Sequence, residues 1–245
     1  MLRIIDARTG EAVEAAPARR GLTRVEVHAA GADTGALRVL LVADLLVRTL
    51  ELGGTPVWGV LSGDPPPAPL RSGATALGIR PLEDSRDVGS GLGETQIIHV
   101  AAEGGPVPAG VLVTVAPVHA DGDDSAPAIP EVADPGVLRL ALLSHHRSVP
   151  VPLGAAALAE AHDTLVRWRR AVAGWARQPS RPIPEEARVR LRTAWEDDLD
   201  TPAVLQVLTW VESAAELPDG ARFETYAFAD RLLGLDLTRD LGSAS

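Results

Sequence analysis

The chain has 245 residues, of which 46% are hydrophobic, so it can build one large domain or two smaller ones. Its formal net charge of -10 argues against non-specific binding to nucleic acid, because phosphates are held by clusters of lysine and arginine. The sequence contains no cysteine and no lysine. These absences exclude disulfides, thiolate nucleophiles, cysteine-ligated metals, Schiff bases and the lysine of a phosphate-binding loop.

The start of the chain predicts neither an export signal nor a membrane anchor. Charged residues follow Met1 closely, and no apolar run reaches the roughly 18 residues needed to cross a bilayer. We therefore expect a cytoplasmic protein without a membrane partner.

The first half of the chain predicts a parallel α/β unit. After a short hairpin-like start, a strand, a small-residue loop, an apolar helix and a second strand are predicted over residues 24–28, 29–35, 36–52 and 55–61. Further buried strands are predicted over residues 96–101 and 110–115. In open α/β sheets a ligand usually binds beyond the carboxyl ends of such strands, so the loop 29–35 is expected to border a site.

From Asp134 onward the pattern becomes helical. Asp134 is predicted to cap a helix that has Pro135 at its first position. Helices are predicted over residues 137–145, 154–178, 183–195, 201–217 and 223–233. The second of them has the apolar spacing of a bundle helix. Its exposed face is predicted to carry Arg167, Arg169, Arg170 and Arg177. The chain is thus divided into a sheet domain over 1–132 and a helical bundle over 133–245.

Two histidines are candidate ligand-binding residues. His28 and His99 end or line two predicted strands at one edge of the sheet, where they can share a pocket. A neutral imidazole there acts as a base or as a ligand. The alternative interpretation is a pair of partly buried histidines that are satisfied within the scaffold, and the sequence favours it.

Four further residues near this edge complete the candidate pocket. Asp33 is either a pocket residue or the cap of the helix, and capping is favoured. Gly31 permits an anion to approach the backbone. Arg38 can bind a phosphate in place of lysine, though with different geometry. Trp58 either closes the pocket or fills the core, and the core is favoured.

Several motifs resemble those of a known family. Residues 134–148 read DPGVLRLALLSHHRS, residues 195–205 read WEDDLDTPAVL and residues 232–237 read LLGLDL. These segments resemble the helical bundle of cysteinyl-tRNA synthetases and of the related mycothiol-pathway cysteine ligases of actinobacteria. Residues 2–10 and 24–28 resemble the opening hairpin and first strand of the same proteins, so the matches run collinearly through the chain.

The resemblance implies a truncated Rossmann-like sheet domain of the class I synthetase type, followed by an α-helical bundle. It also implies ATP-dependent activation of cysteine, but both ATP signatures of the family are missing. Residues 31–38 replace the HIGH motif and contain no histidine. Residues 118–127, where the KMSKS loop is expected, are acidic and would repel a triphosphate.

The zinc ion of the family is not expected either. The resemblance implies that it is held by two cysteines, a histidine and a glutamate. His28 falls on the first cysteine position and can coordinate zinc, whereas the second position corresponds to about Ala102 and the segment bearing the others is absent. One ligand does not make a zinc site. We therefore predict no metal and no obligatory cofactor, with ATP or AMP left as candidate ligands.

These observations lead to two hypotheses about function. The first is a non-catalytic or strongly diverged relative of these enzymes, which binds a small molecule or a protein in a regulatory role. The alternative is an active ATP-dependent ligase or nucleotidyl transferase that reuses the cleft with His28, Asp33, Arg38 and His99. A role on tRNA is disfavoured by the acidic charge and by the lack of an extension after Leu237.

Overall fold

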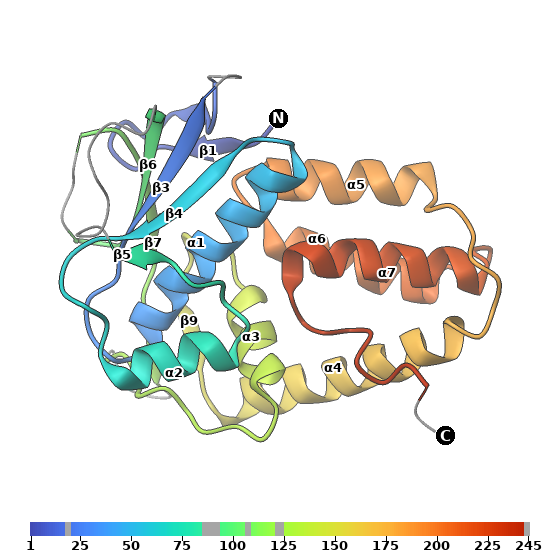
Figure 1. Cartoon of the computed structure of the whole chain (residues 1–245). Helices are drawn as coiled ribbons and strands as arrows, with labels where there is room; N and C mark the ends of the chain where they lie inside the picture. The colour runs from blue at the N-terminus through green and yellow to red at the C-terminus, as the bar shows by residue number, and fades with distance from the viewer. Residues whose placement is uncertain (18–20, 85–93, 106–108, 121–124, 243–245) are drawn as a thin grey trace.

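The computed structural model describes residues 1–17, 21–84, 94–105, 109–120 and 125–242. Its architecture is α/β, as predicted, with a parallel sheet beside a group of helices (Figure 1). The five strands lie in the order β5-β4-β3-β6-β7, and every neighbouring pair is parallel. Their bounds are Leu22–His28 for β3, Val57–Leu61 for β4, Glu83–Asp84 for β5, Glu94–Ala102 for β6 and Val111–Val115 for β7.

The strand order is that of a doubly wound sheet. The chain builds outward from β3 to β4 and β5, then returns to place β6 on the other side of β3. In such sheets the point where the order reverses is where ligands usually bind. The sequence of β3 alternates, so that Val25 and Val27 are buried while Glu26 and His28 face the opposite side of the sheet. The reversal point therefore carries polar side chains on one face.

Helix α1 (Thr34–Leu52) is the central element of the molecule. It connects β3 to β4 and packs between the sheet and the helices α3 and α7 (Figure 1). Its residues are buried almost all round, which explains the apolar sequence of this stretch. The Asp33 side chain accepts a hydrogen bond from the Ala36 N–H at 2.8 Å, so its predicted capping role is confirmed.

The remaining small elements lie around the sheet. Strands β1 (Arg3–Ile5) and β2 (Ala12–Glu14) form the expected hairpin. Helix α2 (Ala68–Ala76) follows β4. Strands β8 (Val118–Ala120) and β9 (Val151–Leu153) pair in parallel, a contact the sequence did not predict.

The helical part contains the five helices that the sequence predicts. They are α3 (Pro135–Leu143), α4 (Ala155–Trp175), α5 (Glu185–Glu196), α6 (Thr201–Ser213) and α7 (Asp219–Leu233). Trp168 and Trp175 of α4 pack edge-on against Tyr226 of α7, with ring centroids 5.8 and 5.1 Å apart. Buried side chains of both parts form one continuous cluster, so no gap in the core marks a domain boundary. The predicted boundary therefore stays a prediction.

One predicted surface residue is buried. Arg169 was expected on the exposed face of α4, but it is only 6% exposed. Its guanidinium pairs with Asp134 and donates hydrogen bonds to the carbonyls of Leu235, at 2.7 Å, and Asp236, at 3.0 Å. Arg169 therefore joins the cap of α3 to the segment that follows α7, because an arginine can satisfy several acceptors at once.

Buried ion pairs join the sheet part to the helical part. Asp44 of α1 accepts a hydrogen bond from Arg139 of α3 at 2.9 Å, and both side chains are almost wholly buried. Burial by itself would raise the pKa of Asp44, but Arg139 and Arg48 outweigh that effect and lower it. Arg139 also donates to the carbonyls of Leu77 and Leu233. The carboxylate is therefore the counterion of a cation that has no access to water.

A second junction links two of the family-like motifs. Arg147 pairs with Asp198, and it donates to the carbonyls of Ile5 at 3.1 Å and Thr114 at 2.8 Å. Arg147 therefore connects the start of the helical part with β1, β7 and the segment between α5 and α6. Asp198 and Leu199 have positive φ angles of 53° and 60°, a conformation that side chains rarely adopt. Within the described part of the chain, no helix is long and apolar enough to cross a membrane.

Candidate functional site

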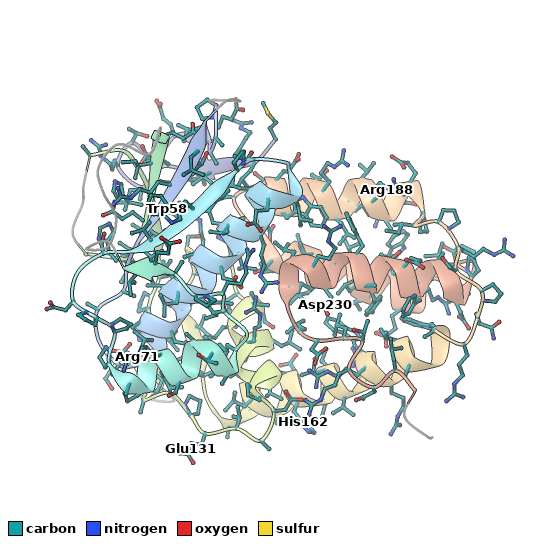
Figure 2. All side chains as sticks on the ribbon, in the orientation of Figure 1. Trp58, Arg71, Glu131, His162, Arg188 and Asp230 are labelled. Carbon is teal, nitrogen blue, oxygen red and sulfur yellow. The ribbon has the colours of Figure 1, made fainter. Side chains whose placement is uncertain are left out.

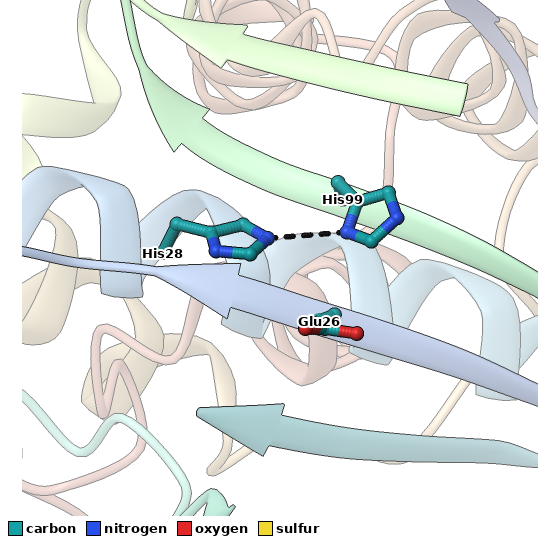
Figure 3. A group of neighbouring side chains, drawn as sticks. All are labelled: Glu26, His28 and His99. Atoms are coloured by element: carbon teal, nitrogen blue, oxygen red, sulfur yellow. Dashed lines mark hydrogen bonds between the residues drawn. The ribbon is translucent and has the colours of Figure 1, made fainter. Parts of the chain in front are cut away.

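The candidate site lies on the polar face of the sheet, at the point where the strand order reverses. His28 is the last residue of β3, and His99 lies within β6. In the parallel register Glu26 is opposite His99, and His28 is opposite Ala101. Partnered residues of parallel strands point to the same side, so Glu26, His28 and His99 share one face (Figure 3).

The two imidazoles are in direct contact. His28 Nε2 lies 3.1 Å from His99 Nδ1, and the ring centroids are 5.3 Å apart (Figure 3). His99 Nε2 lies 3.2 Å from the Ala109 carbonyl oxygen, which can only accept a hydrogen bond. A neutral His99 therefore carries its proton on Nε2, and its Nδ1 accepts from the Nε2–H of His28. This assignment of tautomers follows from the hydrogen-bond network.

Glu26 completes the group and was not identified from the sequence. Its carboxylate accepts a hydrogen bond from the Ser62 hydroxyl and pairs with Arg24 at 3.0 Å. The ligand atoms of Glu26, His28 and His99 all lie within 4.8 Å of one another. The strict alternation of β3 was the signal that could have revealed it, because residues two apart on a strand face the same side.

The surroundings of His28 favour the neutral ring. Partial burial lowers the pKa of His28 below its ordinary value, the nearby Glu26 opposes this, and the neighbouring His99 adds to it. At neutral pH His28 is therefore uncharged. A neutral imidazole has a lone pair with which to bind a cation or a hydrogen-bond donor.

The three groups suit a divalent cation better than the sequence alone suggested. Two nitrogens bound to one tetrahedral zinc ion at about 2.0–2.1 Å lie roughly 3.3 Å apart, close to the separation of the two histidine nitrogens. The hydrogen bond from His99 to Ala109 is the kind of contact that orients a metal-binding histidine. Two histidines and one carboxylate leave coordination positions open for a further ligand. Arg24 opposes the cation and would have to release Glu26.

The N-terminus of α1 is covered by another segment of the chain. Thr34 donates its backbone N–H to the Pro127 carbonyl at 3.0 Å, and its hydroxyl bonds to the carbonyls of Pro127 and Ala128. Asp33 forms an isolated β-bridge with Ala128. Gly31 has a φ of 100°, and a Cβ there would lie 3.1 Å from a carboxylate oxygen of Asp33. The acidic stretch of this loop, residues 121–124, lies outside the described residues.

One of the predicted site residues, Arg38, lies elsewhere. Arg38 is 1% exposed, and its guanidinium donates to the carbonyls of Ala116 at 2.7 Å and His146 at 2.8 Å. Burial lowers its pKa to about 10, so it remains charged at neutral pH. Its hydrogen bonds connect the segment after β7 with the segment after α3. Trp58 lies on β4 opposite Arg24, on the same face as Glu26 (Figure 2).

Comparisons with known proteins agree with the motifs. No family model matches the chain. The chain resembles enzymes named L-cysteine:1D-myo-inositol 2-amino-2-deoxy-alpha-D-glucopyranoside ligase, which are class I synthetase-like cysteine ligases. The one from Parafrankia sp. (strain EAN1pec) is 40% identical over 114 residues, which is 43% of this chain and 25% of that enzyme.

Other relatives give the same result. The ligase from Streptomyces griseus is 40% identical over 111 residues, covering 44% of this chain and 26% of the enzyme. The ligase from Stackebrandtia nassauensis is 35% identical over 136 residues, covering 53% of this chain and 28% of the enzyme. The chain thus matches only about a quarter of the length of these curated relatives.

Proposed function

We propose that this protein binds a ligand and does not activate cysteine with ATP. One observation carries the proposal: the N-terminus of α1 is capped by Asp33 and covered by residues 127–128. The family resemblance implies that ATP phosphates sit at this helix end. In this chain the N–H groups of Thr34 and Ala36 at this helix end already donate hydrogen bonds to Pro127 and Asp33. Residues 127–128 occupy the space beside them.

The electrostatics of this helix end support the same conclusion. A helix N-terminus attracts phosphate because its first N–H groups are free and the helix dipole is positive there. The carboxylate of Asp33 neutralises that dipole, takes the Ala36 N–H and repels a second anion. Arg38, the cation expected to compensate, is directed to backbone carbonyls instead. No lysine exists elsewhere in the chain to replace it.

The remaining candidate binding site is formed by Glu26, His28 and His99. Imidazole nitrogens and a carboxylate oxygen suit Zn²⁺ and similar divalent cations of the transition series. We include such a cation in the proposal, although the sequence predicts none. When bound, it would offer open coordination positions to a small ligand. His28 would bind it by Nε2, with its proton moved to Nδ1, and His99 would bind it by Nδ1, with His99 held in place by Ala109.

Cysteine-dependent exchange of pyrophosphate into ATP tests the absence of amino-acid activation. The purified protein is assayed beside one of the ligases from Streptomyces griseus or Parafrankia as a positive control. We expect no exchange above the blank, and no thermal shift with ATP, AMP or a cysteinyl-adenylate analogue. A clear cysteine-dependent exchange would overturn the proposal and favour an active ligase that reuses the cleft.

Metal binding is tested separately by titration with Co²⁺ and Zn²⁺, followed by visible absorption and calorimetry. We expect one equivalent to bind, and the variants His28→Gln and His99→Gln to lose it. The matched control is His162→Gln, which changes an exposed histidine of α4. Equal binding by all the variants, or no binding at all, would remove the metal from the proposal without affecting the conclusion about ATP.

A further inference from the structure

A second candidate site lies at the other end of α1, where the helix ends against the helical part. An open cavity of about 660 Å³ is lined there by the hairpin β1–β2, the last turn of α1 and the helices α5 and α7. This volume falls within the range of small-molecule sites, roughly 300–1,000 Å³. The 19 residues of α1 separate it from Asp33 by roughly 28 Å. It is therefore independent of the site proposed above.

The floor of this cavity is apolar. Leu2, Leu50 and Trp195 line it and are each less than 10% exposed. Trp195 packs against Phe228, which also lines the cavity, with ring centroids 5.3 Å apart. Two aromatic rings set at 58° to each other offer a surface for a flat or apolar molecule.

The rim carries arginines without strong partners. Arg188, which is labelled in Figure 2, and Arg192 lie one turn apart on α5, and Arg231 lies on α7. Among the described residues, no hydrogen bond or ion pair engages the guanidinium of Arg192 or Arg231. The nearest carboxylate to Arg188 is that of Glu185 at 3.9 Å, and both side chains are exposed. A pair of this kind contributes little binding energy.

Most carboxylates of the cavity are already paired. Glu51 pairs with Arg80 at 2.5 Å, and Glu196 accepts a hydrogen bond from the α-amino group of Met1 at 2.7 Å. Glu14 remains as the opposing charge. The rim is therefore locally positive on a protein whose net charge is -10. Such a local excess of positive charge attracts a small anion to this place and to few others.

We propose that this cavity binds a small organic anion with an apolar or aromatic body. The body would lie against Trp195 and Phe228, and the carboxylate or phosphate group would be held by Arg188, Arg192 and Arg231. Guanidinium groups bind both kinds of anion by paired hydrogen bonds. Glu14 and the carbonyl end of α1 disfavour a polyanion, so the ligand is a molecule with a single anionic group.

Matched pairs of probes test this inference on the full chain. Naphthalene-2-carboxylate is compared with naphthalene-2-carboxamide, which has the same body without the charge. Phenyl phosphate shows whether a phosphate group binds as well as a carboxylate. Inorganic phosphate, which has no ring, shows what the ring contributes. Binding is followed by calorimetry and by tryptophan fluorescence, to which Trp195 contributes. We expect one saturable site for an aromatic anion, with the carboxamide binding about tenfold more weakly or worse.

Substitutions identify the location of the binding. The double variant Arg192→Gln/Arg231→Gln changes two exposed side chains, so the fold is expected to persist, and an unchanged melting temperature checks this. We expect it to weaken binding of the best probe by about tenfold or more. Arg170→Gln, on an exposed position of α4 outside the cavity, is the matched control and should bind normally.

Three results would overturn the inference. They are no saturable binding of either aromatic anion, equal binding of the carboxamide and the carboxylate, or equal binding by the double variant and the control. Tight binding of heparin with none of the aromatic anions would also count against it, because it would indicate a polyanion surface. None of these results depends on whether the protein activates cysteine or binds a metal.

Discussion

Single arginine side chains hold together elements that are far apart in the sequence. Arg38, Arg139, Arg147 and Arg169 are all less than 10% exposed, and each donates to at least two backbone carbonyls of other elements. The planar guanidinium has five N–H donors, so one side chain can satisfy several buried acceptors. In a chain without lysine, these four arginines satisfy backbone carbonyls in or beside several helices and strands.

Removal of the Asp44 carboxylate should destabilise the protein strongly. Asp44→Ala leaves the fully buried Arg139 without its counterion, and loss of one partner of a buried pair costs about 3–5 kcal/mol. The free energy of unfolding, measured with urea, should fall by that amount. The control Glu51→Ala breaks an exposed pair with Arg80 and should cost about 1 kcal/mol or less. Similar losses in both variants would contradict the prediction.

Protonation of His28 should weaken the fold in mild acid. Its pKa is lower in the folded protein than the ordinary value of 6.5, mainly because of burial, so the unfolded chain takes up the proton first. The stabilising contribution is complete above pH 6.5 and is lost as pH falls through the lower folded value. An NMR titration of the ring should show a pKa below 6.5. His28→Gln should make the free energy of unfolding less sensitive to pH in this window, and a ring pKa at or above 6.5 would refute the idea.

Among the elements, α1 connects the regions on which the proposals about binding depend. Its amino end is capped and covered, and its carboxyl end borders the cavity with the arginine rim. The sheet contributes the third feature, the histidine pair beside the strand that leads into α1. Most residues of the helix are buried, and its length separates these places.

Substitutions of Asp33, the cap of α1, separate the effect of its charge from the effect of its hydrogen bond. Asparagine caps a helix about as well as aspartate, whereas alanine costs about 1 kcal/mol. Asp33→Asn should therefore retain the thermal stability of the protein, and Asp33→Ala should lower the free energy of unfolding by about that amount. Neither variant is expected to gain binding of ATP, because residues 127–128 still cover the helix end. A measurable ATP affinity in Asp33→Asn would show that the carboxylate alone excludes the nucleotide.

The longer elements could be predicted from sequence because their patterns are strong. The alternation of β3 and the apolar length of α1 specify their type, and the Asp-Pro cap specifies the start of α3. The parallel pair β8 and β9 could not be predicted, since three residues carry no periodicity and their pairing depends on the tertiary fold.

The candidate site was predicted only in part for similar reasons. The proximity of His28 and His99 follows from two strands that end at one edge, and it is present in the structure. Glu26 could have been inferred from the same alternation. Arg38 was interpreted as a phosphate ligand, although it stands beside Leu37 and Val39 on a helix that is apolar on nearly every side. A buried arginine must be satisfied by groups of the protein itself, and Arg38 is satisfied by backbone carbonyls.

At the scale of the whole molecule, the sheet and the helices share one core. The buried apolar cluster runs without a break from the strands through α1 to α7. The ion pair of Asp44 and Arg139 joins α1, which lies beside the sheet in Figure 1, to α3. Parts that share a core of this kind lose contacts together, because unfolding of one exposes the buried surface and the unpaired charge of the other. This argues against two independently stable domains, even though the sequence changes character at about residue 133.

The full chain should therefore unfold in a single cooperative transition. Four of the five tryptophans, residues 168, 175, 195 and 210, lie in the helical part, so fluorescence reports chiefly on that part. Far-UV circular dichroism reports on both parts. The urea midpoints from the two methods should coincide in the native protein. In Asp44→Ala, which removes the central ion pair, the two midpoints should separate if the junction is what couples the parts. Distinct midpoints already in the native protein would instead support two domains with a boundary near residue 133.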